Sequence, residues 1–424
     1  MHGLWCPLMV TANEGELRDL DSLTVPLVGS VVLTGDPFEP YRLLDRGGKC
    51  VGGVTAYLRD LQACGRPATT LRSYAMDLLR WYRFLWSVEV PWEQATRVEA
   101  RDFSLWLRVA DKPRRPHWRH PGEPPVRLAL PAAPNALTGK PATGTKYAPS
   151  TAAHAESVLR SFYDFHLEAG SGPMVNPFPL TRLQKSQRHR SPMEPPSRTQ
   201  TGRYRPRVPR RLPRQIPDER FTELFAALSS HRDRALVSLW VSTGARASEL
   251  LGLTNGDVDP GEQLITVVRK GTRSLQRLPA APDAFVWLRL YQAEMHGLVP
   301  TGRDEPLWWT LRRPFRRLTY DAARAMFDRA NGTLGANWTL HDLRHSAAYR
   351  MARDPKVSVT DVQWILGHAR LSTTQTYLNP LEEDVIASVL AYHARRAEGR
   401  TDPPLNSPAY RAESLDVLFG RASS

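Results

Sequence analysis

The sequence predicts a mainly α-helical protein of two domains, with one small β-sheet in its second half. The chain has 424 residues, which is longer than a single hydrophobic core usually supports. Apolar residues recur at three- and four-residue steps through much of it, whereas a two-residue alternation stands out at 263–279. Residues 181–215 are basic and rich in proline, so we expect a linker between two packed regions.

The first domain is expected to be all-α over residues 46–180. Apolar residues from Leu71 to Leu85 define the buried face of one helix. A second helix is expected at about 98–109, and a third is expected to begin with Ser150 as its N-cap. Residues 112–149 are rich in proline and glycine, which predicts a long loop or insertion between these two helices.

The second domain is expected at 216–400. Its β signal is the alternation along Leu264–Val268, followed by a Lys-Gly-Thr turn and a second strand that ends at Pro279. This is the pattern of a β-hairpin. The two ends of the chain are an N-terminal extension, 1–45, whose mixed composition allows no assignment, and a polar tail, 401–424.

The composition favours a polyanionic partner. The formal net charge is +14 and the isoelectric point is near 10.0. The sequence contains no run of 18 or more apolar residues, so no membrane span is expected. The first residues lack the basic start of a secretory signal. Cys6, Cys50 and Cys64 are too few and too scattered for a disulfide framework. A reducing, cytoplasmic location is therefore expected, and nucleic acid becomes the favoured polyanion.

Basic side chains of the first predicted domain and of the linker are candidate DNA contacts. The linker is either a solvated spacer or a basic strap along a phosphate backbone, and the total charge favours the strap. The arginines of the first helix face away from its apolar side. The candidate DNA-binding residues are Arg72, Arg80, Arg83, Arg203, Arg205, Arg207, Arg210 and Arg211.

Two basic residues of the second domain, Arg246 and Lys270, lie in sequence contexts that are common in proteins without any catalytic role. Arg246, in STGARASELLGL, precedes Glu249 by three residues, and such a pair on a helix face contributes only about 0.2–0.5 kcal/mol. Lys270 lies at the predicted hairpin turn, where lysine is common. Taken alone, each has a purely structural explanation.

The stretch HDLRH is more specific. Thr339 and Asp342 predict the N-terminal cap of a helix, which places His341 on the same face as Arg344 and His345. Two histidines four residues apart also occur in zinc proteases. That alternative fits poorly, because an aspartate replaces the required glutamate and no third ligand follows, so no metal is expected.

The stretch LGHARLSTTQTYLN contains His368 and Tyr377. Thr360 with Gln363, and Ser372 with Gln375, predict two capped helices, the first of which ends at Gly367. The simple interpretation of the tyrosine is a half-buried residue of a surface helix. The alternative is that it acts together with the other stretches.

Taken together, these side chains suit attack on a phosphodiester. Two guanidiniums can clamp the non-bridging oxygens, and a tyrosine can be the nucleophile. Forming its phenolate at pH 7 costs roughly 4 kcal/mol, which a histidine or a local positive field can offset. A lysine can donate a proton to the leaving alkoxide. The reaction needs neither a metal nor a nucleotide cofactor.

The four stretches resemble the tyrosine recombinase family, also called phage integrases, which includes the Xer recombinases and Cre. The resemblance rests on TGARASELLGL, on RKG in a hairpin, on HDLRHSAA and on LGHARLSTTQTY, and it covers about residues 216–395. It implies an α+β catalytic domain of tyrosine recombinase type. In pattern only, 46–180 is similar to the all-α, SAM-like core-binding domain of the family.

The resemblance implies roles for six residues. Arg246 and Arg344 would clamp the phosphate, and His368 would hydrogen-bond to it. Lys270 would protonate the leaving 5′-oxygen, while Tyr377 would form a 3′-phosphotyrosyl intermediate.

The sixth is His341, which would assist proton transfer at the tyrosine, while Glu249 and His345 would support the site. The implied function is a site-specific recombinase or integrase of a mobile element in the bacterial cytoplasm. It would act as a homotetramer on two double-stranded DNA sites, with DNA-bending or directionality factors as further candidate partners. A type IB-like topoisomerase and a non-catalytic architectural DNA-binding factor are the alternatives. The apolar spacing of Val385, Ile386, Val389 and Leu390 predicts a C-terminal helix that docks either on a neighbouring subunit or on its own domain.

Overall fold

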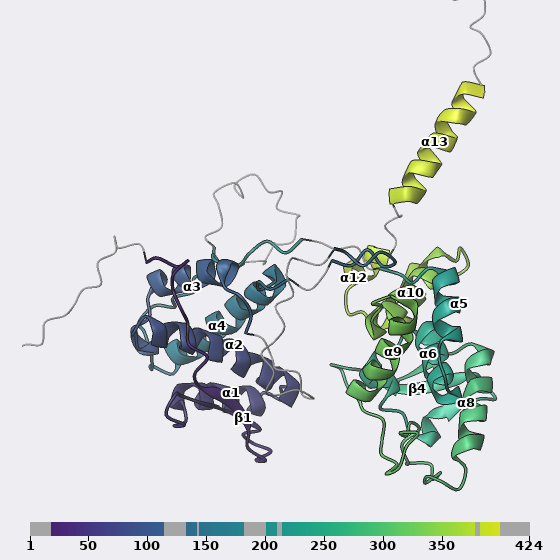
Figure 1. The fold of residues 1–424 in the computed structure, drawn as a ribbon, viewed down its shortest axis with the longest axis horizontal. Coiled ribbons are helices and arrows are strands. Elements are labelled where there is room, and N and C mark those ends of the chain that lie inside the picture. The colour runs from purple at the N-terminus through teal and green to yellow at the C-terminus, as the bar shows by residue number, and fades with distance from the viewer. Residues whose placement is uncertain are drawn as a thin grey trace, which may run out of the picture. The chain divides into compact units, whose positions relative to one another are not determined.

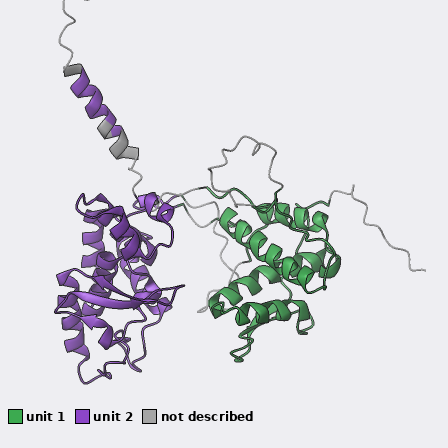
Figure 2. Ribbon diagram, turned by 180° about the vertical axis from the view of Figure 1, so that it is seen from behind, with its two compact units in different colours: residues 1–133, 141–210 green, residues 134–140, 211–424 purple. Residues whose placement is uncertain are grey.

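The computed structural model describes residues 18–113, 133–141, 144–181, 201–209, 214–377 and 382–398. It divides into two units (Figure 2). Unit 1 comprises residues 1–133 and 141–210, and unit 2 comprises residues 134–140 and 211–424. Most of the expected insertion and linker, and all of the C-terminal tail, lie outside the described residues, as do Arg210 and Arg211.

Unit 1 is built from four helices around an aromatic core (Figure 1). They are α1 (Gly52–Ala63), α2 (Ala68–Ser87), α3 (Arg97–Val109) and α4 (Pro149–Glu168), with a short 3-10 turn, η1 (Trp92–Gln94). The predicted face from Leu71 to Leu85 is buried in α2, which confirms that helix. Trp81 lies at the centre, in edge contact with Phe103 and Phe178. Burial of such large rings supplies much of the stability of the unit.

The expected N-cap of α4 was wrong. The helix begins at Pro149, with Ala148 at the N-cap position. Proline is favoured at the first helical position because its fixed φ suits the helix and its missing N–H would have no partner there. Ser150 therefore lies inside the first turn.

A two-stranded sheet in unit 1 comes from the N-terminal extension that the sequence left unassigned. Strands β1 (Ser30–Leu33) and β2 (Tyr41–Leu44) pair antiparallel and pack on α1 and α2, with Leu43 fully buried. Strands of four residues give too short an alternation to be read from sequence. The two strands are stabilised by packing against α1 and α2.

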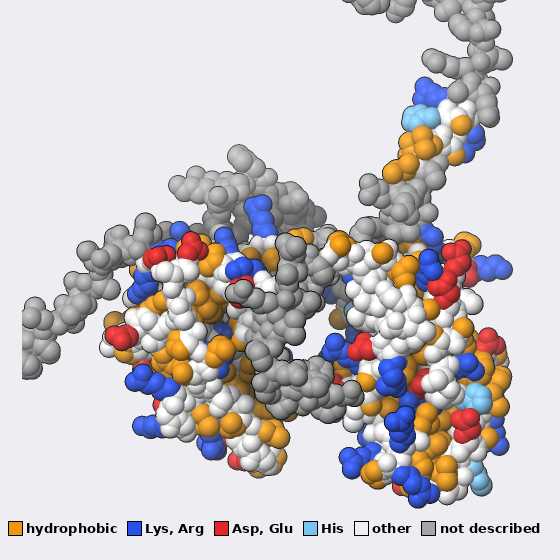
Figure 3. All heavy atoms as spheres, in the orientation of Figure 1, with side chains coloured by type: hydrophobic (Ala, Val, Ile, Leu, Met, Phe, Trp, Pro, Cys, Tyr) orange, Lys and Arg blue, Asp and Glu red, His pale blue; other side chains and the backbone are white. Residues whose placement is uncertain are grey.

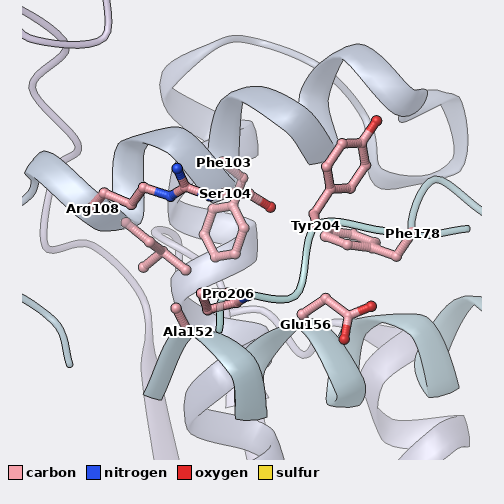
Figure 4. A pocket seen from close by; sticks show the side chains of 9 residues that line it. Phe103, Ser104, Arg108, Ala152, Glu156, Phe178, Tyr204 and Pro206 are labelled. Carbon is pink, nitrogen blue, oxygen red and sulfur yellow. The ribbon is translucent and has the colours of Figure 1, made fainter. Parts of the chain in front are cut away.

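Part of the basic segment before unit 2 also belongs to unit 1. The amide of Thr181 donates to the carbonyl of Thr201 at 2.8 Å, and the amide of Arg203 donates to that of Pro179 at 2.9 Å. This returning chain closes a pocket against α3 and α4 (Figure 4). The pocket is lined by Phe103, Ser104, Leu107, Arg108, Ala152, Glu156, Phe178, Tyr204 and Pro206.

Unit 2 packs its helices around α6 (His231–Thr243), where Leu236, Leu239 and Trp240 are fully buried. Helices α8 and α10 pack against it. The other helical elements are α5 (Asp218–Ala226), α7 (Ala247–Leu250), η3 (Asn255–Asp257), α8 (Pro282–Met295), α9 (Tyr320–Leu334), α10 (Leu340–Arg353), α11 (Val359–Leu366), α12 (Leu371–Thr374), η4 (Gln375–Tyr377) and α13 (Glu382–Glu398).

The sheet of unit 2 confirms the predicted hairpin. Strands β4 (Leu264–Val268) and β5 (Leu275–Pro279) pair antiparallel, and a third strand, β3 (Val258–Asp259), which the sequence did not reveal, pairs with β4. Ile265 and Val267 point into the core and are fully buried. The turn between β4 and β5 includes Gly271 with φ +107°. No helix in the described part of the chain is both long enough and apolar enough to cross a membrane.

Candidate active site

The first arginine is fixed by the junction between α6 and α7. Helix α6 ends at Gly244 with φ 60°, and a Cβ there would come within 2.9 Å of Leu366, so a glycine is needed. Arg246 then occupies the N-cap of α7 rather than the helix itself. Its amide donates to Glu249 Oε2 at 2.9 Å and its guanidinium donates to Oε1 at 2.9 Å. The predicted pair with Glu249 is therefore present as a cap.

The carboxylate of Glu249 joins this arginine to the hairpin. It is buried, and it also accepts from the Lys270 amide at 3.1 Å and from the Arg269 guanidinium at 3.0 Å. Burial by itself would raise the pKa of Glu249. The hydrogen bonds from the Arg246 and Lys270 amides and the nearby guanidiniums prevail, so its pKa lies below the ordinary value.

Arg269 is a residue of the site that sequence reasoning missed. It is 4% exposed, and besides Glu249 it donates to Gln276 Oε1 at 2.6 Å and to the carbonyl of Ile365. Its neighbour Lys270 projects from the hairpin and is exposed. The β4 alternation contained the signal, because residue 269 follows the buried positions 265 and 267 on the same face.

The second arginine is presented by α10. The predicted cap is confirmed: the Thr339 amide donates to Asp342 Oδ2 at 2.6 Å, which sets where the helix begins. One turn on, Arg344 is 3% exposed and donates to the carbonyls of Gly244 at 2.6 Å and Leu366 at 2.7 Å. Burial, reinforced by the charge of Arg246, lowers the pKa of Arg344 to about 10.

His368 follows the end of α11 at Gly367, as predicted. Its Nε2 lies 3.1 Å from the Arg344 guanidinium and its Nδ1 lies 2.9 Å from the hydroxyl of the buried Thr374. The ring of Tyr377 is nearly parallel to it, with an interplanar angle of 10° and centroids 6.2 Å apart. The loop after α11 therefore carries the histidine and the tyrosine together.

The capping residues expected around this loop were wrong. Helix α11 begins at Val359, capped by Ser358 and Asp361 instead of Thr360 and Gln363. Helix α12 begins at Leu371 after Arg370, without a side-chain cap from Ser372. Several serines, threonines and aspartates compete here, and the path of the incoming chain selects among them.

Tyr377 is 7% exposed, and its hydroxyl lies 2.8 Å from Nδ1 of His345. Burial raises the pKa of Tyr377, whereas the charges of Arg344 and Arg246 act to lower it. Burial also lowers the pKa of His345 to about 4 and that of His368 to about 4, so both rings are neutral near pH 7. In this state the phenol is protonated and held by a neutral imidazole.

His341 lies in the first turn of α10, and its expected role in proton transfer stays a prediction. Its side chain is exposed, and its ring meets the edge of the His345 ring with centroids 4.3 Å apart. In this structure the Tyr377 hydroxyl lies beside His345, one helical turn further along. In the described residues no three His, Cys, Asp or Glu side chains are grouped so that they could hold a metal ion.

The site has an excess of buried positive charge. Two guanidiniums, those of Arg246 and Arg269, share the carboxylate of Glu249, and the buried Arg344 lies in the same site. Arg344 donates to carbonyl oxygens and to His368 rather than to a carboxylate. A phosphate group would supply the missing negative charge, and a buried hydroxyl beside it could attack.

A short segment from the expected insertion supports the same helix. Residues 134–140 belong to unit 2, where Lys140 pairs with Asp342 and also donates to the Asn337 carbonyl at 3.1 Å. Asn135 donates to the carbonyl of Gly335 at 2.8 Å. These contacts hold the turn before α10, and composition alone gave no sign of them.

Several candidate DNA-binding arginines have partners inside unit 1. Arg80 pairs with Asp77, and Arg83 donates to the carbonyl of Val28 at 2.6 Å. Arg205 donates to the carbonyl of Ala153 at 3.0 Å. The side chains of Arg72, Arg203 and Arg207 are exposed.

The sequence is similar to those of known recombinases. Residues 215–384 match the phage integrase family. The tyrosine recombinase XerC of Pseudomonas aeruginosa is 32% identical over 220 residues, which are 48% of this chain and 68% of that protein. The tyrosine recombinase XerD of Neisseria meningitidis serogroup B is 29% identical over 198 residues, 45% of this chain and 66% of that protein. The chain thus spans just under two thirds of the length of that XerD.

Solved structures share the fold. The XerH site-specific recombinase bound to palindromic difH substrate, a post-cleavage complex, aligns with a TM-score of 0.52 at 16% identity, over 82% of this chain and 86% of that one. The Tn1549 transposon integrase in complex with circular intermediate DNA aligns with a TM-score of 0.50 at 15% identity, over 80% and 98%. The predicted fold class, mainly helical with small sheets, is confirmed.

Proposed function

Because the chain belongs to the phage integrase family of tyrosine recombinases, we propose that it is a site-specific DNA recombinase. It cleaves and rejoins DNA strands through a 3′-phosphotyrosyl intermediate, without metal or ATP. The phosphotyrosine bond conserves the energy of the phosphodiester, so rejoining to a new strand needs no external energy source. The observation that carries the proposal is the buried Tyr377 hydroxyl within the field of Arg344 and Arg246, whose positive charge is not balanced by carboxylates.

The roles follow from position. Arg246 and Arg344 clamp the scissile phosphate, and His368, already in contact with Arg344, hydrogen-bonds to it. Tyr377 attacks the phosphorus. Lys270, exposed on the hairpin whose base is tied to Glu249, protonates the leaving 5′-oxygen.

The partner in this proposal is double-stranded DNA. The helical domain at 46–180 binds the core site and the domain at 216–400 is catalytic, and the net charge of +14 supports such a partner. The XerH and Tn1549 integrase structures that share the fold are complexes with DNA. The second of these suggests a mobile element as the source.

The active assembly is a homotetramer on two DNA sites. Helix α13 supports this proposal, because Ile386, Val389 and Leu390 on it are 51%, 45% and 63% exposed. Figure 3 shows hydrophobic side chains on the surface of this helix. Side chains of this kind at helical spacing suit a docking site on a neighbouring subunit.

The test uses a nicked suicide substrate that carries the recombination site mapped from junctions in cells. The wild-type chain is expected to form a covalent DNA adduct that survives SDS, while Tyr377→Phe forms none and still retards the DNA. Tyr163→Phe, at a buried tyrosine of unit 1, is the matched control and should keep the adduct. An adduct in the Tyr377→Phe variant would show that another residue is the nucleophile.

A second reaction separates the proposal from its nearest alternative. A recombinase exchanges strands between two copies of its site, whereas a type IB topoisomerase relaxes supercoiled plasmids that lack any site. Relaxation of such plasmids without site-dependent exchange would overturn the recombinase assignment and leave the tyrosine chemistry in place.

A further inference from the structure

We propose that residues 134–140 form a clasp on α10 and that Lys140 within it is a positioning residue for Arg344. This inference rests on the proposed function and deepens it, since it adds a residue that orders the same site. The clasp lies in the sequence between α3 and α4, and the residues on both sides of it, 1–133 and 141–210, belong to unit 1. The clasp itself belongs to unit 2. A short piece from the first half of the chain thus becomes part of the half that carries the candidate active site.

The clasp is a turn that its own hydrogen bonds hold together. The side-chain oxygen of Asn135 accepts from the amides of Leu137 at 3.1 Å and Thr138 at 2.9 Å. The Asn135 amide donates to the carbonyl of Lys140 at 2.9 Å, and the amide of Gly139 donates to the carbonyl of Asn135 at 2.7 Å. Because the turn is already ordered by these bonds, docking it on another part of the chain costs little conformational entropy.

The clasp docks on the turn that leads into α10. The side-chain amide of Asn135 donates to the carbonyl of Gly335 at 2.8 Å, and the hydroxyl of the buried Thr138 donates to the side-chain oxygen of Asn337. From the other side, the guanidinium of Arg214 donates to the carbonyl of Thr138 at 2.9 Å. These bonds run between residues that are far apart in the sequence and fix the clasp in one place on unit 2.

Lys140 joins the clasp to the start of the helix. Its ammonium group pairs with Asp342 Oδ2, donates to the carbonyl of Asn337 at 3.1 Å and lies 5.5 Å from the ring centroid of Trp338. A carboxylate, a carbonyl and an aromatic face are the groups that an ammonium ion prefers. The side chains of Lys140 and Asp342 are 20% and 9% exposed, so the pair is largely shielded from water. Removal of the ammonium group would leave a mostly buried carboxylate without this cation.

The same carboxylate fixes the first turn of α10. Asp342 Oδ2 accepts from the Thr339 amide at 2.6 Å and from the Thr339 hydroxyl at 2.8 Å. Arg344 follows two residues later, so its guanidinium moves with this turn. A displacement of about 1 Å at a reacting group can cost about 10²-fold in rate. The contacts of Lys140 within the described residues are with the turn and the start of α10, so we infer that it affects the reaction by holding Arg344 in place.

Single-turnover adduct formation on the suicide substrate, measured for the full chain over a range of DNA concentrations, tests the role of Lys140. Lys140→Met keeps the aliphatic stem and removes the charge. It is expected to lower the rate at saturating DNA by roughly 10–10²-fold, while the half-saturating DNA concentration stays within about threefold of wild type. Lys140→Arg keeps the charge and should restore the saturating rate to within about threefold. Lys146→Met neutralises an exposed lysine of unit 1, is the matched control and should keep the wild-type rate.

A double-mutant cycle with Asp342→Asn tests whether Lys140 acts through this carboxylate. Asparagine can still accept the hydrogen bond of the Thr339 amide but offers no charge to the ammonium group. The double variant should therefore be about as slow as Asp342→Asn alone, whereas independent effects would multiply.

Four results would overturn the inference. They are a saturating rate of Lys140→Met within about threefold of wild type, a change confined to the half-saturating DNA concentration, a loss that Lys140→Arg does not restore, and multiplying effects in the cycle. A change confined to the half-saturating concentration would make Lys140 a DNA contact. If the wild-type chain forms no adduct, the proposed function fails instead, and the two failures are distinguishable.

Discussion

The two units of the molecule bury charged groups in different ways. In unit 1 the buried carboxylates each have a guanidinium partner: Glu99 and Asp102 share Arg18 at 2.8 and 2.9 Å, and Glu156 meets Arg160 at 2.8 Å. At the candidate site of unit 2, Arg246 and Arg269 share the carboxylate of Glu249, and the buried Arg344 contacts carbonyl oxygens and His368. A balanced cluster stabilises a fold, whereas an unbalanced one needs a ligand of opposite charge. The imbalance, not the burial, marks the candidate site.

The buried tyrosines repeat this contrast. Tyr163 in unit 1 accepts from Trp81 Nε1 at 2.9 Å and donates to the Trp92 carbonyl at 3.1 Å, so neither partner can take its proton. Tyr377 has a histidine as its partner. Both phenols are buried, and of the two only Tyr377 lies beside an imidazole nitrogen.

The largest expected difference between the two units is the effect of removing a buried arginine. Arg344→Ala removes a cation that has no carboxylate of its own, so adduct formation should fall by roughly 10²–10³-fold while the free energy of unfolding changes less than for a balanced pair. Arg160→Ala in unit 1 is the matched control and should lower stability without slowing adduct formation on DNA-saturated protein. Single-turnover kinetics and urea unfolding measure the two effects. Similar rate losses in both variants would contradict the distinction.

The next largest difference is expected in the free energy of unfolding when a buried carboxylate is neutralised. The pKa of Glu249 is lowered by its hydrogen bonds, whereas burial raises the pKa of Glu156. Glu249→Gln leaves Arg269 buried without its counter-charge and should lower the free energy of unfolding of unit 2 by about 3–5 kcal/mol. Glu156→Gln should cost unit 1 clearly less, since neutralising that group relieves part of its burial penalty. Urea titrations that follow each unit separately check this, and an equal cost would remove the contrast.

The smallest expected effect is a pH dependence of stability. His345 and His368 have folded pKa values of about 4, below the ordinary 6.5, so the unfolded chain binds more protons between these values. The free energy of unfolding should therefore fall as the pH drops from about 6.5 to about 4, by about 1 kcal/mol per ring after allowance for solvent screening. His345→Gln should flatten this slope between pH 7.5 and pH 5 in urea titrations. An unchanged slope would mean that the folded ring titrates normally.

Local patterns in the sequence were enough to predict several helices, the hairpin and the candidate reactive side chains. Helical periodicity gave α2, the alternation of Leu264–Val268 gave the hairpin, and Thr339 with Asp342 gave the start of α10, because each depends on residues close together in the chain. The order of an arginine, a lysine, HDLRH and a tyrosine was enough to suggest phosphoryl transfer.

Which of these residues contact one another depends on the packing of distant elements. Spacing cannot tell His341 from His345, since both share one face of α10, and only the packing of η4 selects the partner of Tyr377. The Glu249 carboxylate joins α7 to the hairpin across about twenty residues, and residues 134–140 hold α10 from a distant part of the sequence. Contacts between residues far apart depend on how whole elements pack, and that information is not contained in any local pattern of the chain.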